Sequence, residues 1–69
     1  MELSARNQFP GKVRAIKLGN VMAEIIVDIG GGHEVVSTIT RGSAERLGLA
    51  QGSPVTVVIK ATEVLLAKD

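Results

Sequence analysis

The 69-residue chain has no cysteine, no tryptophan and no tyrosine, and its only aromatic residue is Phe9. The absence of cysteine excludes disulfide bonds and thiolate zinc sites. The single histidine, His33, excludes a metal site built from several histidines of one chain. A catalytic triad is also poorly supported, because the one histidine lies beside a run of glycines and is most simply a solvated turn residue. We therefore expect a protein that is not an enzyme and that has no direct protein–metal ligands.

The chain also lacks a large excess of charge of either sign. Eight Lys and Arg residues and seven Asp and Glu residues give a formal net charge of +1. A nucleic-acid-binding protein normally has a clustered basic surface, and single-strand binders add aromatic stacking platforms. No apolar run approaches the ~20 residues of a membrane span, and the N-terminus does not resemble a signal peptide. We expect no nucleic-acid partner, no membrane association and a cytoplasmic location.

The length allows a single domain, residues 1–69, and a domain of this size buries only about 60% of its unfolded surface. The apolar fraction of 45% is almost entirely aliphatic, so the core lacks the large rings that fill a small nucleus. Small proteins become stable through disulfides, a structural metal or self-association. Only self-association remains here, so the sequence predicts a homo-oligomer; a monomer with a thin aliphatic core is the alternative.

Hydrophobic alternation indicates an all-β protein with one short helix. The clearest strand spans residues 21–29, where Val, Ala and Ile recur at period two, and its second face is partly apolar at Met22 and Ile26. Three glycines, residues 30–32, predict a hairpin turn into a return strand over 33–40. Further strands are predicted over 13–18, 55–60 and 62–67, with a bend at 10–11 and turns at 19–20 and 51–54.

A short helix is predicted after the return strand, where Ser43 or Gly42 caps its start and Gly48 ends it, with Leu49 packing back. Five or six short strands with one brief helix suit a small closed β-barrel of the oligonucleotide/oligosaccharide-binding (OB) type.

Three segments concentrate the hydrogen-bond donors that a tetrahedral dianion needs. They are the polar run of residues 4–8, the hydroxyls of residues 40–44 at the predicted helix start, and Lys60 with its two successors. The alternatives are that Ser43 only caps the helix and that Lys60 only ends a strand. Glu24 and Asp28 share a strand face and could form a carboxylate pair, although such pairs are more often solvated.

The opening Ser4-Ala5-Arg6-Asn7-Gln8, followed by Gly11 and a Val-rich strand, resembles the opening of the molbindins, small proteins that bind molybdate and tungstate. The resemblance extends over essentially the whole chain, through residues 21–24, 38–40, 43–49 and 59–64. The same domain occurs in molybdate-responsive transcription regulators and in the ATPase subunit of molybdate importers. The chain begins at methionine and shows no attached DNA-binding or ATPase segment, so a stand-alone role is expected.

This resemblance implies a five-stranded OB barrel, assembled as a hexamer (a trimer of dimers), with oxyanions held between subunits. The bound ligand would be molybdate or tungstate, and the function its intracellular binding, storage or buffering. An oxyanion-sensing or nucleic-acid-binding OB module that acts on a partner is the alternative. The implied oxyanion-binding residues are Ser4, Ala5, Arg6, Thr40, Ser43, Ala44, Lys60 and Ala61.

A second oxyanion site is implied at the turn formed by Gly19, Asn20 and Val21, which varies within the family. Some relatives have serine where this chain has Ala61, and the loss of that hydroxyl predicts weaker binding here.

Overall fold

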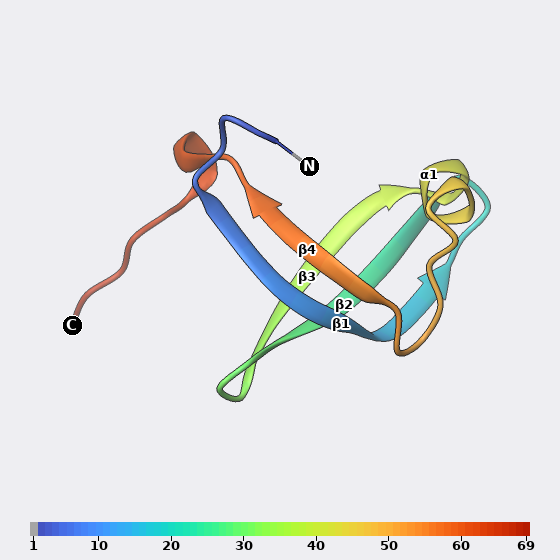
Figure 1. Cartoon of the computed structure of the whole chain (residues 1–69), viewed down its shortest axis with the longest axis horizontal. Helices are drawn as coiled ribbons and strands as arrows, with labels where there is room; N and C mark the ends of the chain where they lie inside the picture. Colours follow the sequence, from blue (N-terminus) through green and yellow to red (C-terminus); the bar gives the residue numbers. More distant parts are fainter. Residues whose placement is uncertain (1) are drawn as a thin grey trace.

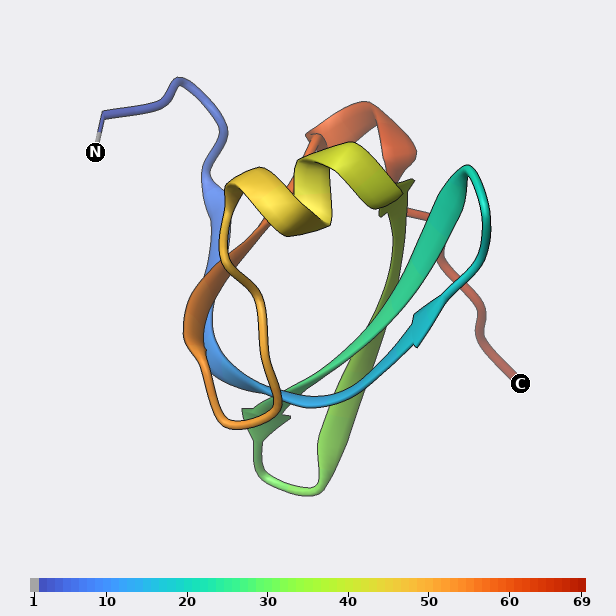
Figure 2. The same cartoon turned by 90° about the vertical axis from the view of Figure 1, so that its right-hand side faces the viewer.

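The computed structural model describes residues 2–69, which form a curled four-stranded antiparallel sheet with one short helix (Figure 1). The sheet order is β3-β2-β1-β4. The helix α1 crosses one end of the curled sheet, which leaves a half-barrel (Figure 2). The predicted all-β class with one short helix is confirmed. The elements are β1 (Asn7–Leu18), β2 (Met22–Gly30), β3 (His33–Thr40), α1 (Arg41–Arg46), β4 (Pro54–Ile59) and the 3₁₀ turn η1 (Ala61–Glu63).

Strand β1 is shared between two ladders. Its first half pairs with β4, from Asn7 opposite Ile59 to Lys12 opposite Pro54, and its second half pairs with β2. A register shift after Val13 marks a β-bulge in the second half, and bulges increase the local bend of a strand. One long, curved strand thus joins the two ladders of the half-barrel (Figure 1).

Gly11 lies where β1 passes from one ladder to the other. A Cβ atom at this position would lie only 2.5 Å from the carbonyl oxygen of Asp28, so no larger residue fits without a shift of the backbone. The prediction that β1 starts at Val13, after a bend at Pro10-Gly11, was therefore wrong. The strand starts at Asn7, and the two residues lie inside it because curvature replaces a turn.

The predicted glycine hairpin is confirmed between β2 and β3. Gly30 pairs with His33, and the two residues between them, Gly31 and Gly32, have φ angles of 62° and 79°. Positive φ at both central positions is what a type I′ turn requires, and only glycine adopts it without strain. The turn sets the register of β2 against β3.

Helix α1 starts earlier than predicted, because its N-cap is Thr40 and not Ser43 or Gly42. The backbone N–H of Ser43 donates to Thr40 Oγ1 at 3.1 Å, which satisfies one of the free donors of the first turn. The predicted end is confirmed: Gly48 has a φ of 63°, and the N–H of Leu49 donates to the carbonyl oxygen of Ala44 at 3.2 Å. This is a Schellman-type stop.

The predicted strand over residues 62–67 is wrong for the single chain. Residues 61–63 form η1, and the following segment leaves the sheet without strand structure (Figure 1). Its Leu65 and Leu66 are 92% and 93% exposed. An apolar run predicts burial but does not name the strand it pairs with, and within residues 2–69 this segment pairs with none. Residues 2–69 therefore show four strands and not the five-stranded barrel that was expected.

The buried core is thin and lies between the curled sheet and α1. The period-two pattern of the second strand holds for Ala23, Ile25 and Val27, which are at most 3% exposed, whereas Val21 lies outside β2 and is 71% exposed. Many large apolar side chains stay exposed on the single chain: Leu3, Phe9, Leu18, Val21, Met22, Val36, Leu47, Val58, Val64, Leu65 and Leu66. None of the helices within residues 2–69 is long and apolar enough to cross a membrane.

Candidate oxyanion site

The first group of predicted residues lies where β1 starts and β4 ends. Asn7 and Ile59 form the last pair of this ladder, so Arg6 and Lys60 are the residues that directly flank the two neighbouring strands. Ser4 and Ala5 precede Arg6, and Ala61 opens η1 directly after Lys60. The structure therefore brings these five predicted residues to one end of the molecule, which we call the β1–β4 end: Ser4, Ala5, Arg6, Lys60 and Ala61.

The β1–β4 end carries two positively charged side chains. Arg6 and Lys60 are both exposed, and within residues 2–69 neither makes an ion pair. Gln8 fixes the backbone just before Arg6, because its side-chain amide donates to the carbonyl oxygen of Ala5 at 2.7 Å. Two cations on adjacent strands repel one another, and an anion between them would turn that repulsion into attraction.

The second group, Thr40, Ser43 and Ala44, lies at the start of α1 and will be called the α1 start. Its hydroxyls are hydrogen-bonded to each other, with 2.8 Å between Thr40 Oγ1 and Ser43 Oγ. The side chain of Ala44 is 4% exposed and belongs to the core, so only its backbone remains for a ligand. Unlike the β1–β4 end, this group offers hydroxyl donors that are already fixed in place.

The two groups lie at opposite ends of β1. Arg6 immediately precedes this strand, whereas Thr40 pairs with Met22, beyond the turn that follows Leu18. In Figure 1 the start of β1 and η1 lie on the left and α1 on the right. A strand rises about 3.3 Å per residue, so even a curved strand of 12 residues separates its ends by far more than the width of a tetrahedral anion. A single chain therefore does not bring all of the predicted residues together.

The turn at residues 19–21 is observed, and it contacts the first residue of α1. The N–H of Gly19 donates to the carbonyl oxygen of Met22 at 2.8 Å, which closes the turn between β1 and β2. Arg41 then fixes the turn to the helix: its N–H donates to Val21 O at 2.7 Å and its Nη1 to Gly19 O at 3.3 Å. Asn20, at the tip of the turn, is exposed.

Sequence reasoning missed two arginines of α1. Arg41 bridges the turn and Glu45, with 2.8 Å between its Nε and Glu45 Oε1, and Arg46 donates from Nη2 to Ser43 Oγ at 3.1 Å. The signal was helical spacing, since Arg41 and Glu45 are four residues apart and Ser43 and Arg46 three apart. It was hidden because the helix start was placed two or three residues too late.

The carboxylate pair considered from the sequence has structural roles instead. Asp28 Oδ1 accepts a hydrogen bond of 2.8 Å from the N–H of Gly30, at the entry to the hairpin. Glu24 lies opposite Lys17 across the β1–β2 ladder. Within residues 2–69 no group of three or more His, Cys, Asp or Glu side chains is placed to hold a metal ion.

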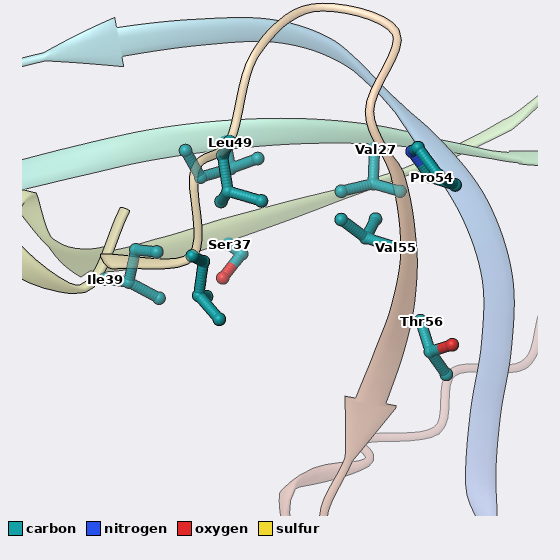
Figure 3. A pocket seen from close by; sticks show the side chains of 9 residues that line it. Val27, Ser37, Ile39, Leu49, Pro54, Val55 and Thr56 are labelled. Atoms are coloured by element: carbon teal, nitrogen blue, oxygen red, sulfur yellow. The ribbon is translucent and has the colours of Figure 1, made fainter. Parts of the chain in front are cut away.

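An open groove of about 400 Å³ lies over the core between the edge strands β3 and β4 (Figure 3). Ser37 and Ile39 line it from β3, and Val55 and Thr56 line it from β4. Because its walls are mostly aliphatic, the groove suits apolar side chains and offers little to a hydrated dianion.

The comparisons with known proteins agree over nearly the whole chain. The model of the TOBE domain matches residues 3–66. Molybdenum-pterin-binding protein 3 of Clostridium pasteurianum is 48% identical over 66 residues, which cover 96% of this chain and 97% of that protein. The solved structure of a molybdate-binding protein from Sporomusa ovata is 41% identical, with a TM-score of 0.91 over 99% of this chain and all of the other.

A second solved structure carries the ligand. The cytoplasmic molybdate-binding protein ModG, in a form with molybdate bound, is 41% identical with a TM-score of 0.84, over 88% of this chain and 43% of that one. The resemblance to molbindins and the OB-type fold are thereby confirmed. The chain belongs to the TOBE-domain family, a family of binding modules, and is closely similar to its small molybdenum-pterin-binding and molybdate-binding members.

Proposed function

We propose that this protein binds molybdate or tungstate as an intact oxyanion and so stores or buffers it in the cytoplasm. The observation that carries the proposal is the match, over nearly the whole chain, to relatives named for molybdate or molybdenum-pterin binding, one of them with molybdate bound. The geometry supports it, since Arg6 and Lys60 make no ion pair within residues 2–69 and the hydroxyls of Thr40 and Ser43 are fixed by a hydrogen bond. We further propose that residues 1–69 act as one domain.

Binding would use hydrogen bonds and charge, without bonds from the protein to the metal. Arg6 and Lys60 bring two positive charges to a dianion, so little buried charge is left uncompensated. The Ser4 hydroxyl and the backbone N–H groups of Ala5 and Ala61 add donors at the same end of the chain. Charge-assisted hydrogen bonds of this kind are about twice as strong as neutral ones. Nothing is turned over, so the proposed role is that of a binding protein and not of an enzyme.

The remaining donors would come from a neighbouring copy. Thr40, Ser43 and the backbone of Ala44 lie at the other end of β1, too far away to share an anion with Arg6 of the same chain. We therefore propose that each oxyanion lies between subunits, with the β1–β4 end of one chain facing the α1 start of another. The turn of Gly19, Asn20 and Val21 is proposed as a second site, where backbone N–H groups would meet an anion.

The exposed apolar surface supports a homo-oligomer, which we propose to be a hexamer built as a trimer of dimers. The segment after η1 begins with Val64, Leu65 and Leu66; within residues 2–69 the two leucines are 92% and 93% exposed, and Val64 is half-exposed. The groove between β3 and β4 is open and apolar, and it is bordered by the two edge strands of the sheet that residues 2–69 form. Covering such surfaces with another copy removes apolar area from water, at roughly 25 cal/mol per Å² buried.

Assembly and binding would then be thermodynamically linked. An anion that binds only the assembled protein stabilises the assembly by mass action, and the effect rises with the free anion concentration. The proposal therefore predicts that molybdate raises both the oligomeric fraction and the unfolding temperature.

The deciding experiment is calorimetric titration with molybdate, tungstate, sulfate and phosphate, run beside a mass determination in solution. We expect tight binding of the first two anions, weak binding of the others and the mass of an oligomer. A monomer that binds none of the four anions would overturn the proposal. Binding of all four with equal affinity would overturn the molybdate and tungstate assignment while leaving a general anion site.

A further inference from the structure

Arg46, in the last turn of α1, makes one hydrogen bond to another side chain, from its Nη2 to Ser43 Oγ at 3.1 Å. It has no carboxylate partner within residues 2–69. Its neighbour Arg41 differs, since its guanidinium is paired with Glu45 and also bonded to the turn at Gly19. Of the two helix arginines, only Arg46 therefore keeps an uncompensated charge, and it holds that charge against a hydroxyl of the proposed site.

The hydrogen bonds around Ser43 can be counted. A hydroxyl oxygen has two lone pairs and one hydrogen. Ser43 Oγ is bonded to Thr40 Oγ1 and to Arg46, and Thr40 Oγ1 also accepts from the N–H of Ser43. The two hydroxyls have two hydrogens, and the network uses only the one that Thr40 donates to Ser43 Oγ. Within residues 2–69 neither hydroxyl donates to any other atom.

The hydrogen that this network does not use is that of the Ser43 hydroxyl, because Thr40 donates to Ser43 Oγ. Because Arg46 and Thr40 both approach Ser43 Oγ, its lone pairs are occupied and its hydrogen is left for an acceptor outside the network. A guanidinium that donates to a hydroxyl oxygen also polarises the O–H bond, which strengthens the hydrogen bond that the hydroxyl donates in turn. The Ser43 hydroxyl can therefore donate to an oxygen atom outside the network, which is water in the free protein and would be an anion oxygen in the proposed complex.

We infer that Arg46 is a positioning residue for the oxyanion: it holds and polarises Ser43 so that the hydroxyl hydrogen points to the bound anion. The inference rests on the proposed function and adds a residue and a role to it. The plainer reading is that Arg46 only interacts with the carbonyl end of α1, as basic residues in a last turn commonly do. The two readings differ in whether the effect of Arg46 depends on the Ser43 hydroxyl.

A double-mutant cycle separates them. Arg46→Gln, Ser43→Ala and the double variant are titrated with molybdate beside the unmodified protein. Because the bonds involved are charge-assisted, we expect each single change to weaken binding by about three- to tenfold, and the double variant to bind no more weakly than Ser43→Ala alone. Arg46→Lys, which keeps a charged donor, should recover part of the loss. Lys12→Gln, which removes an exposed charge from β1, is the matched control and should leave the affinity unchanged.

Each other outcome counts against the inference. If the double variant loses affinity by the product of the two single losses, Arg46 acts independently of Ser43. If Lys12→Gln loses as much affinity as Arg46→Gln, the effect is one of general charge. A lower unfolding temperature of Arg46→Gln with unchanged affinity would support the helix-end role instead. If the unmodified protein binds no molybdate, the proposed function fails as well; if it binds and Arg46→Gln binds equally well, this inference alone fails.

Discussion

The two ends of β1 offer an anion different kinds of contact. At the β1–β4 end, Arg6 and Lys60 are long, exposed side chains with no ion-pair partner in the described part of the chain. At the α1 start, Thr40 and Ser43 are short and already hydrogen-bonded to each other at 2.8 Å. One end supplies charge with loose geometry, and the other supplies hydroxyls in fixed geometry, with the charge of Arg46 held behind Ser43.

This difference suggests a division of labour in the proposed site. Charge attracts any dianion over a distance and does not distinguish sulfate from molybdate, which carry the same charge. Hydroxyls held in one arrangement favour the anion whose oxygen atoms lie at matching positions, and they lose less side-chain freedom on binding. We expect the β1–β4 end to set affinity and the α1 start to set selectivity.

The largest expected effect comes from removing the charge of the β1–β4 end. Arg6→Ala combined with Lys60→Ala should abolish molybdate binding in a calorimetric titration, because a dianion would then lose both neighbouring cations. The control is Lys12→Ala with Lys68→Ala, which removes the same charge elsewhere on the surface. Unchanged affinity in the Arg6 and Lys60 variant would show that the site residues are wrongly assigned.

The next largest effect tests whether the two ends come from different chains. Leu65→Asp with Leu66→Asp should lower the mass in solution and weaken molybdate binding by at least about tenfold, although every proposed ligand residue remains. The reason is that charged side chains at these two positions oppose their burial against another copy. Leu65→Met with Leu66→Met keeps the apolar character and should behave like the unmodified chain. Full binding by a dissociated variant would place the site within one chain.

A smaller effect is expected from Thr40→Val, which keeps the shape of the side chain and removes its hydroxyl. The helix loses its N-cap, which costs about 1 kcal/mol of unfolding free energy. Selectivity should fall more than affinity, so the ratio of molybdate to sulfate affinity is the quantity to measure. Denaturant unfolding reports the stability change separately. A selectivity ratio equal to that of the unmodified protein would contradict the division of labour.

The smallest expected effect is a gain. Ala61→Ser restores a hydroxyl beside Lys60 and should strengthen molybdate binding by about two- to fivefold, in line with one added neutral hydrogen bond. Ala5→Ser is a useful comparison, since it places a new hydroxyl near Arg6 instead. Weaker binding by Ala61→Ser would mean that the position is too crowded for an additional ligand group.

Much of the sheet followed from local sequence patterns. The alternation of Ala23, Ile25 and Val27 predicted a half-buried strand because a pleated strand exposes every second side chain to one face, and these residues are indeed buried. The glycine hairpin followed from backbone sterics, which need no information from distant residues. These features depend on neighbours in the sequence, so the sequence is enough to predict them.

Other features depend on contacts that local patterns do not carry. Gly11 looked like a turn residue, and only the nearby carbonyl of Asp28 shows that it allows a close approach inside a strand. Thr40 looked like the end of a strand, and only the hydrogen bond from Ser43 shows that it caps α1. The apolar segment at 62–67 was read as a strand, although residues 2–69 offer it no strand to pair with. The residues of the candidate site were taken from a resemblance, and their division between two ends of β1 emerged only in three dimensions.

That division has a consequence for stoichiometry. Each chain carries one β1–β4 end and one α1 start. In the proposed arrangement every copy therefore contributes to two sites, with its β1–β4 end in one and its α1 start in the other. A closed, symmetric assembly would leave no half unmatched and would hold as many anions of this class as it has chains, whereas an open array would leave a half-site at each end. Counting bound molybdate per chain therefore also reports whether the assembly is closed.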